Sequence, residues 1–396
     1  MGAISGQRRR VGVAVVGLGG AVASTAVAGV QLLKRGSNRL DGLPLADVSV
    51  PGLVDYRDLS FGGWDLHGED LASAAANHRV LSADQLSETQ GDLADLRPWP
   101  AIGNAAFCRN IEGANQRLVP SHRAAIDAIA GDLRRFRDGV DGVVMINLAS
   151  TERWPEDTTP FASLGAFERA LDEDSEAIGP GMLYAYAAIQ EGVPYGNFTP
   201  SLGADIPALL EFAEQRNVPV AGKDGKTGQT MMKTVLAPAF KARSLHVDGW
   251  FSTNILGNRD GLALDNPESL KSKLKTKGSV LDSILGYKVE DHLVDIRYYR
   301  PRGDDKEAWD NIDISGFLGH KMQVKVNFLC KDSILAAPLV LEIARVLDLA
   351  QQRGDGGVQE QLSTFFKAPM VAEGRSPEHA LHRQDQNLLD WLSGAA

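Results

Sequence analysis

The residues best suited to chemistry lie in the stretch 218–230, whose sequence is VPVAGKDGKTGQT. A short apolar run, typical of a buried strand, leads into a turn that carries Lys223, Asp224 and Lys226, and a helix is predicted from Thr230 onward. Ligands of open α/β sheets bind at the carboxyl ends of the strands, and the free N–H groups of the next helix favour an anion. The stretch therefore predicts a site for a phosphorylated small molecule. The alternative for a turn rich in lysine and glycine is a solvated surface loop.

A second candidate site lies near the N-terminus, where the β-branched run 11–16 precedes a helix-like segment, 23–34. A turn rich in glycine joins them and contains Gly17, Gly19 and Gly20. Such a turn at a helix N-terminus can admit the pyrophosphate of a dinucleotide, although without a third glycine the motif is weak by itself. An acid about 20 residues further on usually binds the ribose, so by spacing alone Asp65 is a poor candidate.

The same region also has features of a twin-arginine or secretory leader, or of a weak membrane span. Three arginines at 8–10 precede an apolar run, 11–33. A leader would have a leucine-rich centre, whereas this run is β-branched and then rich in glycine. We therefore predict a strand, a turn and a helix.

Composition limits the classes of function. The chain has 396 residues, enough for two domains, and a net charge of −10. No overall basic field attracts nucleic acid or an anionic membrane, so neither is expected as a partner. The two cysteines, Cys108 and Cys330, match neither a disulfide framework nor a zinc spacing. We expect a soluble cytoplasmic enzyme and predict no metal site.

Strand-like and helix-like runs alternate as far as Gly222, which favours an α/β fold with a doubly wound sheet and a nucleotide at its upper edge. Helices are predicted over 119–136, 180–190 and 205–216, and a strand over 143–146. The acidic stretch ahead of residue 180 is expected to be loop. Small polar residues after that strand could reach a cofactor.

Beyond Thr230 the pattern changes to separate strand-like runs, typical of a second domain with a mixed or antiparallel sheet. These runs cover 245–253, 292–299 and 322–328. A long apolar helix over 333–349 and a terminal helix near Leu388 are expected to return to the first domain.

Six short motifs occur in order between Val11 and about Pro369: Gly17-Leu18-Gly19-Gly20, Gly63-Trp64-Asp65, Lys226-Thr227-Gly228-Gln229-Thr230, Leu256-Gly257-Asn258-Arg259-Asp260-Gly261, Gly303-Asp304-Asp305-Lys306 and Asp332-Ser333-Ile334-Leu335-Ala336-Ala337-Pro338. Each is weak alone, but together they resemble the inositol-3-phosphate synthase family, also called myo-inositol-1-phosphate synthase. The resemblance implies a Rossmann-type NAD-binding domain interrupted by an α+β catalytic domain that builds a homotetramer. We expect limits at 1–230, 231–332 and 333–396, and NAD as cofactor.

The activity that the resemblance implies is the conversion of D-glucose 6-phosphate to 1D-myo-inositol 3-phosphate. Tightly held NAD oxidises the C5 hydroxyl, the ketone acidifies C6, the C6 enolate attacks the C1 aldehyde, and the hydride returns to C5. An enolate and an alkoxide must be stabilised and protons moved, which explains a need for several lysines.

The family motifs indicate site residues by position. The catalytic residues would be Lys226, Lys277, Lys306, Lys367 and Asp304. The cofactor-binding residues would be Gly17, Gly19, Gly20, Ala21, Asp65, Asn147, Ser150, Thr151 and Asp304. The substrate-binding residues would be Asn197, Lys223, Asp224, Thr227, Gly228, Gln229, Thr230, Lys233, Asn254, Asn258 and Asp260. Lys306 and Lys226 are the first candidates for proton transfer and oxyanion stabilisation, without an assignment of which does which. The other lysines of the run 271–277 are expected to be solvated.

The chain departs from the family pattern near the expected phosphate site. Lys223 replaces an acid, and Met231 replaces a lysine, with Lys233 two residues on. The exchange could be a charge swap that keeps the anion clamp, or a sign of a different sugar phosphate. We interpret the chain as a divergent bacterial-type enzyme. The alternatives are a cyclase for another sugar phosphate, an ordinary NAD-dependent sugar-phosphate dehydrogenase, and a non-catalytic NAD-binding protein.

Overall fold

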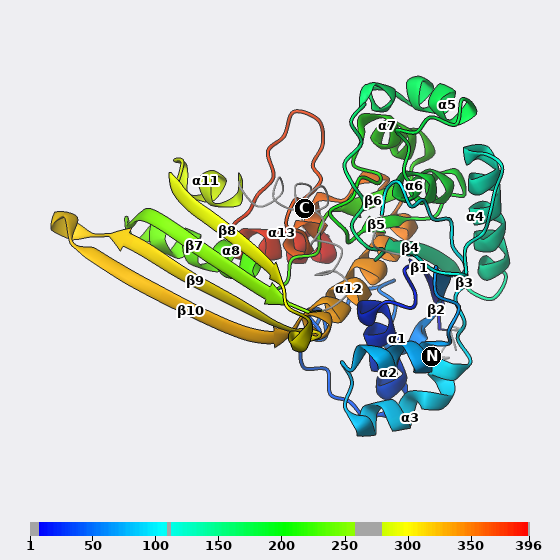
Figure 1. Ribbon diagram of the computed structural model, residues 1–396, viewed down its shortest axis with the longest axis horizontal. Helices are drawn as coiled ribbons and strands as arrows, with labels where there is room; N and C mark the ends of the chain where they lie inside the picture. The colour runs from blue at the N-terminus through cyan, green and yellow to red at the C-terminus, as the bar shows by residue number, and fades with distance from the viewer. Residues whose placement is uncertain (1–7, 109–111, 258–278, 395–396) are drawn as a thin grey trace, which may run out of the picture.

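The computed structural model describes residues 8–108, 112–257 and 279–394. It consists of two lobes, each built on its own sheet (Figure 1). The larger lobe has a seven-stranded parallel sheet in the order β11 (Gly357–Val358), β6 (Pro219–Gly222), β5 (Tyr195–Asn197), β4 (Gly142–Asn147), β1 (Val11–Val16), β2 (Leu59–Asp65) and β3 (Trp99–Pro100). This is the doubly wound α/β architecture that the alternating pattern predicts.

Strand β1 lies inside this sheet between β4 and β2, and all six of its residues are buried. It pairs in parallel with β2 and β4, so that Val16 is level with both Trp64 and Asn147. The carboxyl ends of the three strands therefore meet at one edge. The strand, turn and helix predicted for this region are confirmed. In the described part of the chain, no helix is long and apolar enough to cross a membrane.

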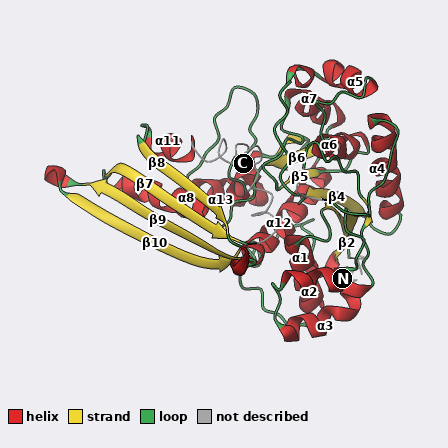
Figure 2. Cartoon of the chain, in the orientation of Figure 1, coloured by secondary structure: helices red, strands yellow, loops and turns green. Residues whose placement is uncertain are grey.

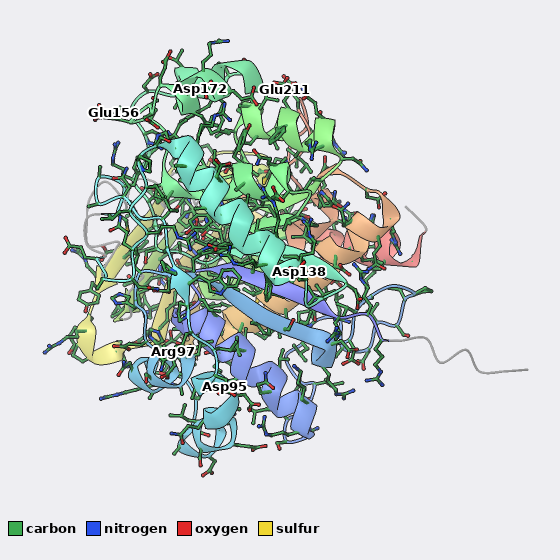
Figure 3. All side chains as sticks on the ribbon, turned by 90° about the vertical axis from the view of Figure 1, so that its right-hand side faces the viewer. Asp95, Arg97, Asp138, Glu156, Asp172 and Glu211 are labelled. Carbon is green, nitrogen blue, oxygen red and sulfur yellow. The ribbon has the colours of Figure 1, made fainter. Side chains whose placement is uncertain are left out.

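Helices cover both faces of the sheet, and each face has its own apolar core (Figure 1). One face carries α1 (Ala21–Arg35), α2 (Leu71–His78), α3 (Ala83–Ala94), α12 (Asp332–Arg353) and α13 (Leu381–Ser393). The other carries α4 (His122–Arg137), α5 (Leu164–Asp172), α6 (Pro180–Gln190) and α7 (Pro207–Arg216). Charged side chains such as Asp172 point outward from this second layer (Figure 3). Helix α5 lies in the acidic stretch that was expected to be loop, so this expectation is wrong. The sequence analysis missed the helix because its apolar stripe is short and flanked by acids.

The second lobe is a long four-stranded sheet with strand order β10 (Lys321–Lys331), β9 (Asp305–Ser315), β7 (His246–Leu256) and β8 (Asp291–Tyr298). It is mixed, because β7 and β8 are parallel while the other pairs are antiparallel (Figure 2). Helices α8 (Gly228–Ala242) and α11 (Ser279–Leu285) pack on one face. The sequence analysis missed β9, since the buried Lys306 and Asp310 interrupt its apolar alternation.

After β10 the chain returns to the first lobe through α12, which packs against α1 and against β4, β5 and β6. The connections also contain short 3-10 turns, η1 (Tyr56–Asp58), η2 (Thr159–Phe161), η3 (Arg300–Arg302), η4 (Phe317–Gly319) and η5 (Glu360–Phe365). Our domain limits, 1–230, 231–332 and 333–396, remain a proposal. The first limit falls within α8 and the second at the start of α12.

Candidate functional site

The glycine turn between β1 and α1 is held tightly against the sheet edge. The N–H groups of Gly17 and Leu18 both donate to the carbonyl oxygen of Trp64, at 2.8 and 3.0 Å. Gly17 has a φ of 90°, and a Cβ there would lie 3.0 Å from the carbonyl oxygen of Leu148. Helix α1 then begins at Ala21, and Gly20 before it provides no side-chain cap. Its first N–H groups are thus available to an anion, as a dinucleotide pyrophosphate requires.

Asp65 ends β2 beside this turn. Its carboxylate accepts the N–H of Gly19 and the N–H of His67, both at 2.9 Å. Spacing made Asp65 a poor candidate because the segment 37–58 is inserted between α1 and β2, which lengthens the usual interval. The structure nevertheless brings Asp65 to the position of a ribose-binding acid. Its role in binding remains a prediction.

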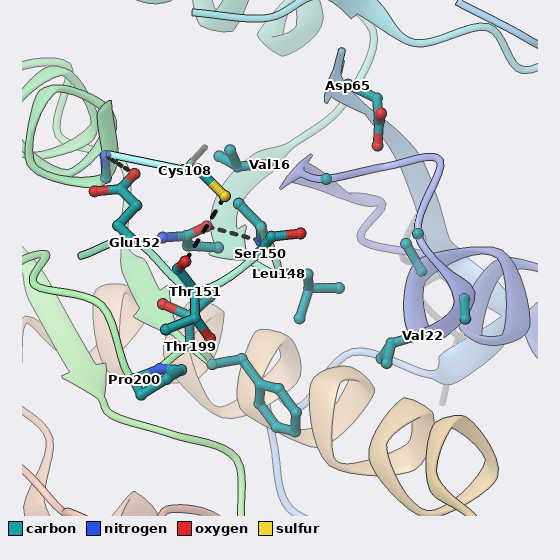
Figure 4. Close-up of a pocket in the computed structure, with 18 of the residues that line it drawn as sticks. Val16, Val22, Asp65, Cys108, Leu148, Ser150, Thr151, Glu152, Thr199 and Pro200 are labelled. Atoms are coloured by element: carbon teal, nitrogen blue, oxygen red, sulfur yellow. Dashed lines mark hydrogen bonds between the residues drawn. The ribbon is translucent and has the colours of Figure 1, made fainter. Parts of the chain in front are cut away.

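A single cavity of about 270 Å³ joins the glycine turn to the lysines. One end is lined by Gly17, Gly20, Ala21 and Asp65, and the other by Asp224, Thr227, Lys306, Asp332 and Lys367. Asn147, at the end of β4, and Ser150 and Thr151, in the loop after it, also line the cavity. Figure 4 shows Ser150 and Thr151. The structure therefore brings together residues expected to bind a cofactor and residues expected to perform chemistry.

The cavity wall fits a dinucleotide. The hydroxyl of Thr151 is buried and has no hydrogen-bond partner among the described residues. A buried polar group without a partner is costly, so this hydroxyl indicates a ligand or a bound water in the cavity. Asn147 is different, because its Oδ1 accepts the N–H of Ala149 at 3.0 Å and thereby shapes the loop.

Lys367 and Asp224 form a buried ion pair at the far end of the cavity. Lys367 Nζ donates to Asp224 Oδ1 at 2.7 Å, and both side chains are less than a tenth exposed. The backbones are also joined, since the N–H of Lys367 donates to the carbonyl oxygen of Asp224. All residues from 218 to 230 are buried. The interpretation of this stretch as a solvated loop is therefore wrong.

A second cluster connects Lys306, Asp332 and Thr227. Asp332 Oδ1 accepts hydrogen bonds from Lys306 Nζ at 3.2 Å and from Thr227 Oγ1 at 2.9 Å. Neighbouring Asp304 accepts the N–H and the hydroxyl of Ser333, at 3.0 and 2.8 Å, at the start of α12. An acid in the first turn of a helix is stabilised by the helix dipole. Asp304 is not among the described residues that line the cavity, so the structure gives it a positioning contact.

Lys226 does not face this cavity in the described structure. Its Nζ donates to the side-chain oxygen of Gln384 in α13, and burial lowers the pKa of the amine to about 7. Lys223 likewise turns aside, to an ion pair with Asp205 and a position 5.0 Å from the centre of the Trp154 ring. The charge of Lys223 is thus neutralised within the fold, which does not support the expected anion clamp.

Several expected substrate-binding residues lie beneath the second sheet instead. Gln229 Nε2 donates to Asp310 Oδ1 at 3.3 Å, and the amide of Asn254 donates to Gln229. Lys233 Nζ lies 2.7 Å from His292 Nε2, and burial lowers the pKa of Lys233 to about 8. This polar network connects α8 to the sheet and is not part of the described cavity wall.

Asn197 is fully buried, and its side chain bonds to Ser201 and Thr199 in the turn after β5. It therefore shapes the turn. Gly228 and Thr230 lie at the start of α8. Lys277, Asn258 and Asp260 fall outside the described residues, as do the other lysines of the run 271–277.

The sequence analysis missed three groups of the cavity wall. Asp332 was quoted within a motif and Glu152 lay in the polar stretch after the strand 143–146, but neither was given a role, and His78 was not considered. His78 Nε2 lies 2.8 Å from the carbonyl oxygen of Gly19. The signal for Glu152 was its position directly after Thr151, past a strand end. No local signal marks His78, because it reaches the turn from another helix.

Comparison with known proteins decides the family. A family model described as myo-inositol-1-phosphate synthase matches residues 42–393. This model is one of a group of models for NAD-binding proteins. The chain belongs to this family. NAD is accordingly its cofactor.

The family includes curated relatives that match over nearly the whole chain. Inositol-3-phosphate synthase 1 of Bacteroides thetaiotaomicron is 42% identical over 95% of this chain and 93% of that protein. Inositol-3-phosphate synthase isozyme 1 of Arabidopsis thaliana is 30% identical over 98% of this chain and 86% of that protein. The higher identity with a bacterial relative agrees with the predicted bacterial type.

Solved structures give the same result. The crystal structure of inositol-3-phosphate synthase from Caenorhabditis elegans has a TM-score of 0.91 and 25% identity, over 98% of this chain and 86% of that chain. A myo-inositol-1-phosphate synthase-related protein from Thermotoga maritima has a TM-score of 0.81 and 25% identity, over 97% and 98%. The predicted fold and family are confirmed.

Proposed function

We propose that this protein converts D-glucose 6-phosphate to 1D-myo-inositol 3-phosphate. The observation that carries the proposal is the single cavity that joins the glycine turn at α1 to Lys306 and Lys367. The geometry suits a reaction in which a dinucleotide and a sugar phosphate meet end to end. The near full-length match to inositol-3-phosphate synthases supports this substrate.

Bound NAD would supply the redox chemistry, by taking a hydride from C5 and later returning it. The chain contributes the uncapped N-terminus of α1, which favours the diphosphate. It also contributes Asp65, placed for a ribose hydroxyl. Ser150 and Thr151 also line the cavity.

Four proton movements balance the reaction. Oxidation at C5 releases the hydroxyl proton and enolisation releases one from C6, while ring closure and re-reduction each return a proton to oxygen. Lys306 and Lys367 lie at the substrate end, and each is bonded to a carboxylate through which a proton can pass. Their ammonium groups can also donate hydrogen bonds to the enolate and alkoxide oxygens. We place them ahead of Lys226, which bonds to Gln384.

The phosphate would bind at the start of α8. This helix begins after Thr227 without a side-chain cap, so the N–H groups of Gly228, Gln229 and Thr230 are available to an anion. Thr227 also lines the cavity, which places this helix end beside Lys306 and Asp332. Lys277 remains part of the proposal through its place in the family motif.

We further propose a cytoplasmic homotetramer. Cys108 and Cys330 are both free thiols, as a reducing compartment favours. The second sheet is covered by α8 and α11 on one face, while its other face exposes Phe251, Leu293 and Trp309. An apolar sheet face of this kind is suited to association with another copy.

The test is phosphorus NMR of the protein with glucose 6-phosphate and catalytic NAD, with NADH absorbance followed in the same sample. We expect a new phosphomonoester resonance matching inositol 3-phosphate without accumulation of NADH. Lys306→Met should lower turnover by about 10²–10⁴-fold, since it removes a proton-transfer group. NADH formed in proportion to product would instead indicate a dehydrogenase. Absence of a new resonance would reject this substrate and direct attention to other sugar phosphates.

A further inference from the structure

The larger lobe contains a second cavity, separate from the one that begins at the glycine turn. It has a volume of about 290 Å³ and is formed where the segment 37–58, between α1 and β2, packs against α1 and α12. Leu33 in α1 and Arg345 in α12 line it, together with residues of the segment. Asp332 lines the first cavity at the start of α12, and Arg345 follows about 20 Å further along that helix. A ligand in the second cavity would therefore not touch the lysines of the proposed reaction.

A buried guanidinium group, that of Arg345, belongs to the wall of the second cavity. Arg345 is 4% exposed, and its guanidinium carbon lies 3.8 Å from the centre of the Tyr56 ring. Its Nε donates to the carbonyl oxygen of Val54 and its Nη1 to Glu342 Oε2, both at 2.7 Å. Its Nη2 bonds to no described residue, yet this atom is not closed off from solvent. The N–H groups of Nη2 are thus the donors that Arg345 offers to the cavity.

Glu342 balances the charge of Arg345 but does not satisfy these donors. Its Oε1 accepts the N–H of Leu45 at 2.9 Å and the hydroxyl of Tyr56 at 2.5 Å, and its Oε2 accepts from Arg345 Nη1. Burial raises the pKa of Tyr56, so its hydroxyl keeps the proton that it donates. Glu342 is fully buried and is not among the described residues that line the cavity. The remaining N–H groups of Arg345 cost free energy unless water or a ligand accepts from them.

A second guanidinium group, that of Arg57, lines the same cavity near the protein surface. Its neighbour in the chain, Tyr56, is the residue whose ring lies against Arg345. The nearest carboxylate oxygen is Asp55 Oδ2, which lies 3.6 Å from Arg57 Nη1, too far for a hydrogen bond. Arg57 and Asp55 are both exposed. The cavity therefore has one cation inside and a second, loosely paired cation near its opening.

The wall favours a small anion with an apolar body. Its aliphatic side chains are those of Leu33, Leu40, Val48, Val50 and Leu53. Guanidinium groups bind carboxylate and phosphate oxygens by charge-assisted hydrogen bonds. The two arginines are already paired with two carboxylates, Glu342 and Asp55, so one further negative charge meets less repulsion than two. A monocarboxylate therefore fits this cavity better than a phosphate dianion.

We propose that the second cavity is a binding site for a small organic monocarboxylate. The carboxylate accepts hydrogen bonds from Arg345 Nη2, and the charge of Arg57 attracts it at the opening. The apolar body of the ligand packs against the aliphatic wall. This site is separate from the cavity of the proposed function, so the inference goes beyond that function.

The competing explanation is that Arg345 serves only to hold the segment 37–58 against α12. Arg345→Lys keeps a cation beside Glu342 but removes the Nη2 donors. Arg57→Met removes the charge at the opening, and its guanidinium has no hydrogen bond within the described structure to lose. The matched control is Arg39→Met. Arg39 lies in the same segment, forms an exposed pair with Asp41 and does not line the cavity.

The probe is 4-fluorobenzoate, and its neutral counterpart is 4-fluorobenzamide. Fluorine NMR measures the Kd of the full-length protein for each, with Tm recorded for every variant. We expect the wild type to bind the acid at least tenfold more tightly than the amide. Arg345→Lys should weaken binding of the acid at least tenfold and Arg57→Met about threefold, the effect of an exposed charge, whereas Arg39→Met should leave it unchanged. Arg57→Met decides the question if Arg345→Lys does not fold.

Three results would overturn the proposal. They are no binding of 4-fluorobenzoate, equal affinity for the acid and the amide, and an unchanged Kd in the folded variants of Arg345 and Arg57. Inorganic phosphate, added as a competitor, tests the class of anion, and we expect it to displace the probe only at a concentration at least tenfold above that of benzoate. Displacement by less phosphate than benzoate would reject a monocarboxylate site. Because binding is measured without turnover, failure of this inference is distinct from failure to convert glucose 6-phosphate.

Discussion

At the scale of single residues, the site is built from ion pairs, one of them buried and the other partly buried. Lys367 with Asp224, and Lys306 with Asp332, come from distant parts of the chain and meet in one cavity wall. Desolvation makes each charge expensive alone, so the pair is stable only when both members are present. Catalytic geometry and stability are therefore coupled in this wall.

Removal of one member of the buried pair should reveal this coupling. Lys367→Met is expected to lower the free energy of unfolding by about 3–5 kcal/mol, because it leaves Asp224 without this cation. The double variant Lys367→Met/Asp224→Asn should recover part of the loss. Urea denaturation measures all three proteins. As a control, Lys288→Met breaks an exposed pair with Glu290 and should cost less than about 1 kcal/mol. Equal losses at the two sites would contradict the argument.

Lys226 should make the free energy of unfolding depend on pH in the range between about 7 and 10. Burial lowers its pKa from 10.5 to about 7 in the folded protein. Between these values the unfolded chain binds more protons than the folded one, so the free energy of unfolding rises with pH across this window. Lys226→Met removes the titrating group. We therefore expect the stability of the wild type relative to Lys226→Met to rise from about pH 7 to about pH 10. Denaturation at several pH values tests this, and a constant difference would refute it.

The same variant has a second readout in His379. Burial, and next the charge of Lys226, lower the pKa of His379 to about 4. Lys226→Met removes the second cause, so the pKa of His379 should move upward toward its ordinary value. Histidine NMR titration measures it. No upward movement would show that Lys226 is not charged near His379.

At the scale of elements, the glycine turn joins β1 to α1 and approaches the end of β4. Gly17 needs its positive φ, and its Cα lies where a side chain would meet the Leu148 carbonyl. The turn can therefore bring backbone N–H groups close to a diphosphate only with glycine at this position.

Gly17→Ala should consequently weaken NAD binding at least tenfold and lower stability by about 1–2 kcal/mol, the cost of a left-handed backbone at a residue with a Cβ. Gly29→Ala is the matched control. Gly29 is inside α1, and a Cβ there would meet nothing within 4 Å. This control should gain about 0.5–1 kcal/mol from helix propensity and keep its NAD affinity. Calorimetric titration and thermal melts measure both, and equal NAD affinities would contradict our assignment of the turn.

At the scale of the whole molecule, the larger lobe forms most of the site and the second lobe adds Lys306 from β9. The second lobe also presents a long sheet with an uncovered face (Figure 2). Phe251 and Trp309 lie on this face with ring centres 5.7 Å apart, and both are 37% exposed. Leu293 pairs with Phe251 in the register of β7 and β8 and extends the apolar surface. This is the surface that the proposed tetramer would bury.

A charge at its centre should break that association. Trp309→Asp is expected to convert the tetramer to smaller species, because an aspartate buried between subunits would have no partner. Leu118→Asp, at an 87% exposed residue of the other lobe, should leave the mass unchanged. Light scattering coupled to size-exclusion chromatography measures both. An unchanged mass for Trp309→Asp would exclude this face as the interface.

The sequence by itself determined the elements and the family. Apolar periodicity and turn residues are local, so they predicted β1, α1, β4, α6 and α12 close to their observed bounds. The six motifs, taken in order, led to the family and to NAD because they contain residues that the reaction needs, whatever the fold around them. The pattern failed at β9, where buried polar residues replace the expected apolar ones.

Tertiary structure decided which side chains reach the cavity. Lys226 and Lys306 are equal candidates in the sequence, yet of the two only Lys306 lines the described cavity. Lys226 instead donates a hydrogen bond to Gln384 in α13. Asp65 was judged by its spacing, but the register of β2 against β1 places it beside the glycine turn. The direction of a side chain depends on contacts between elements far apart in the chain, and local pattern contains no information about those contacts.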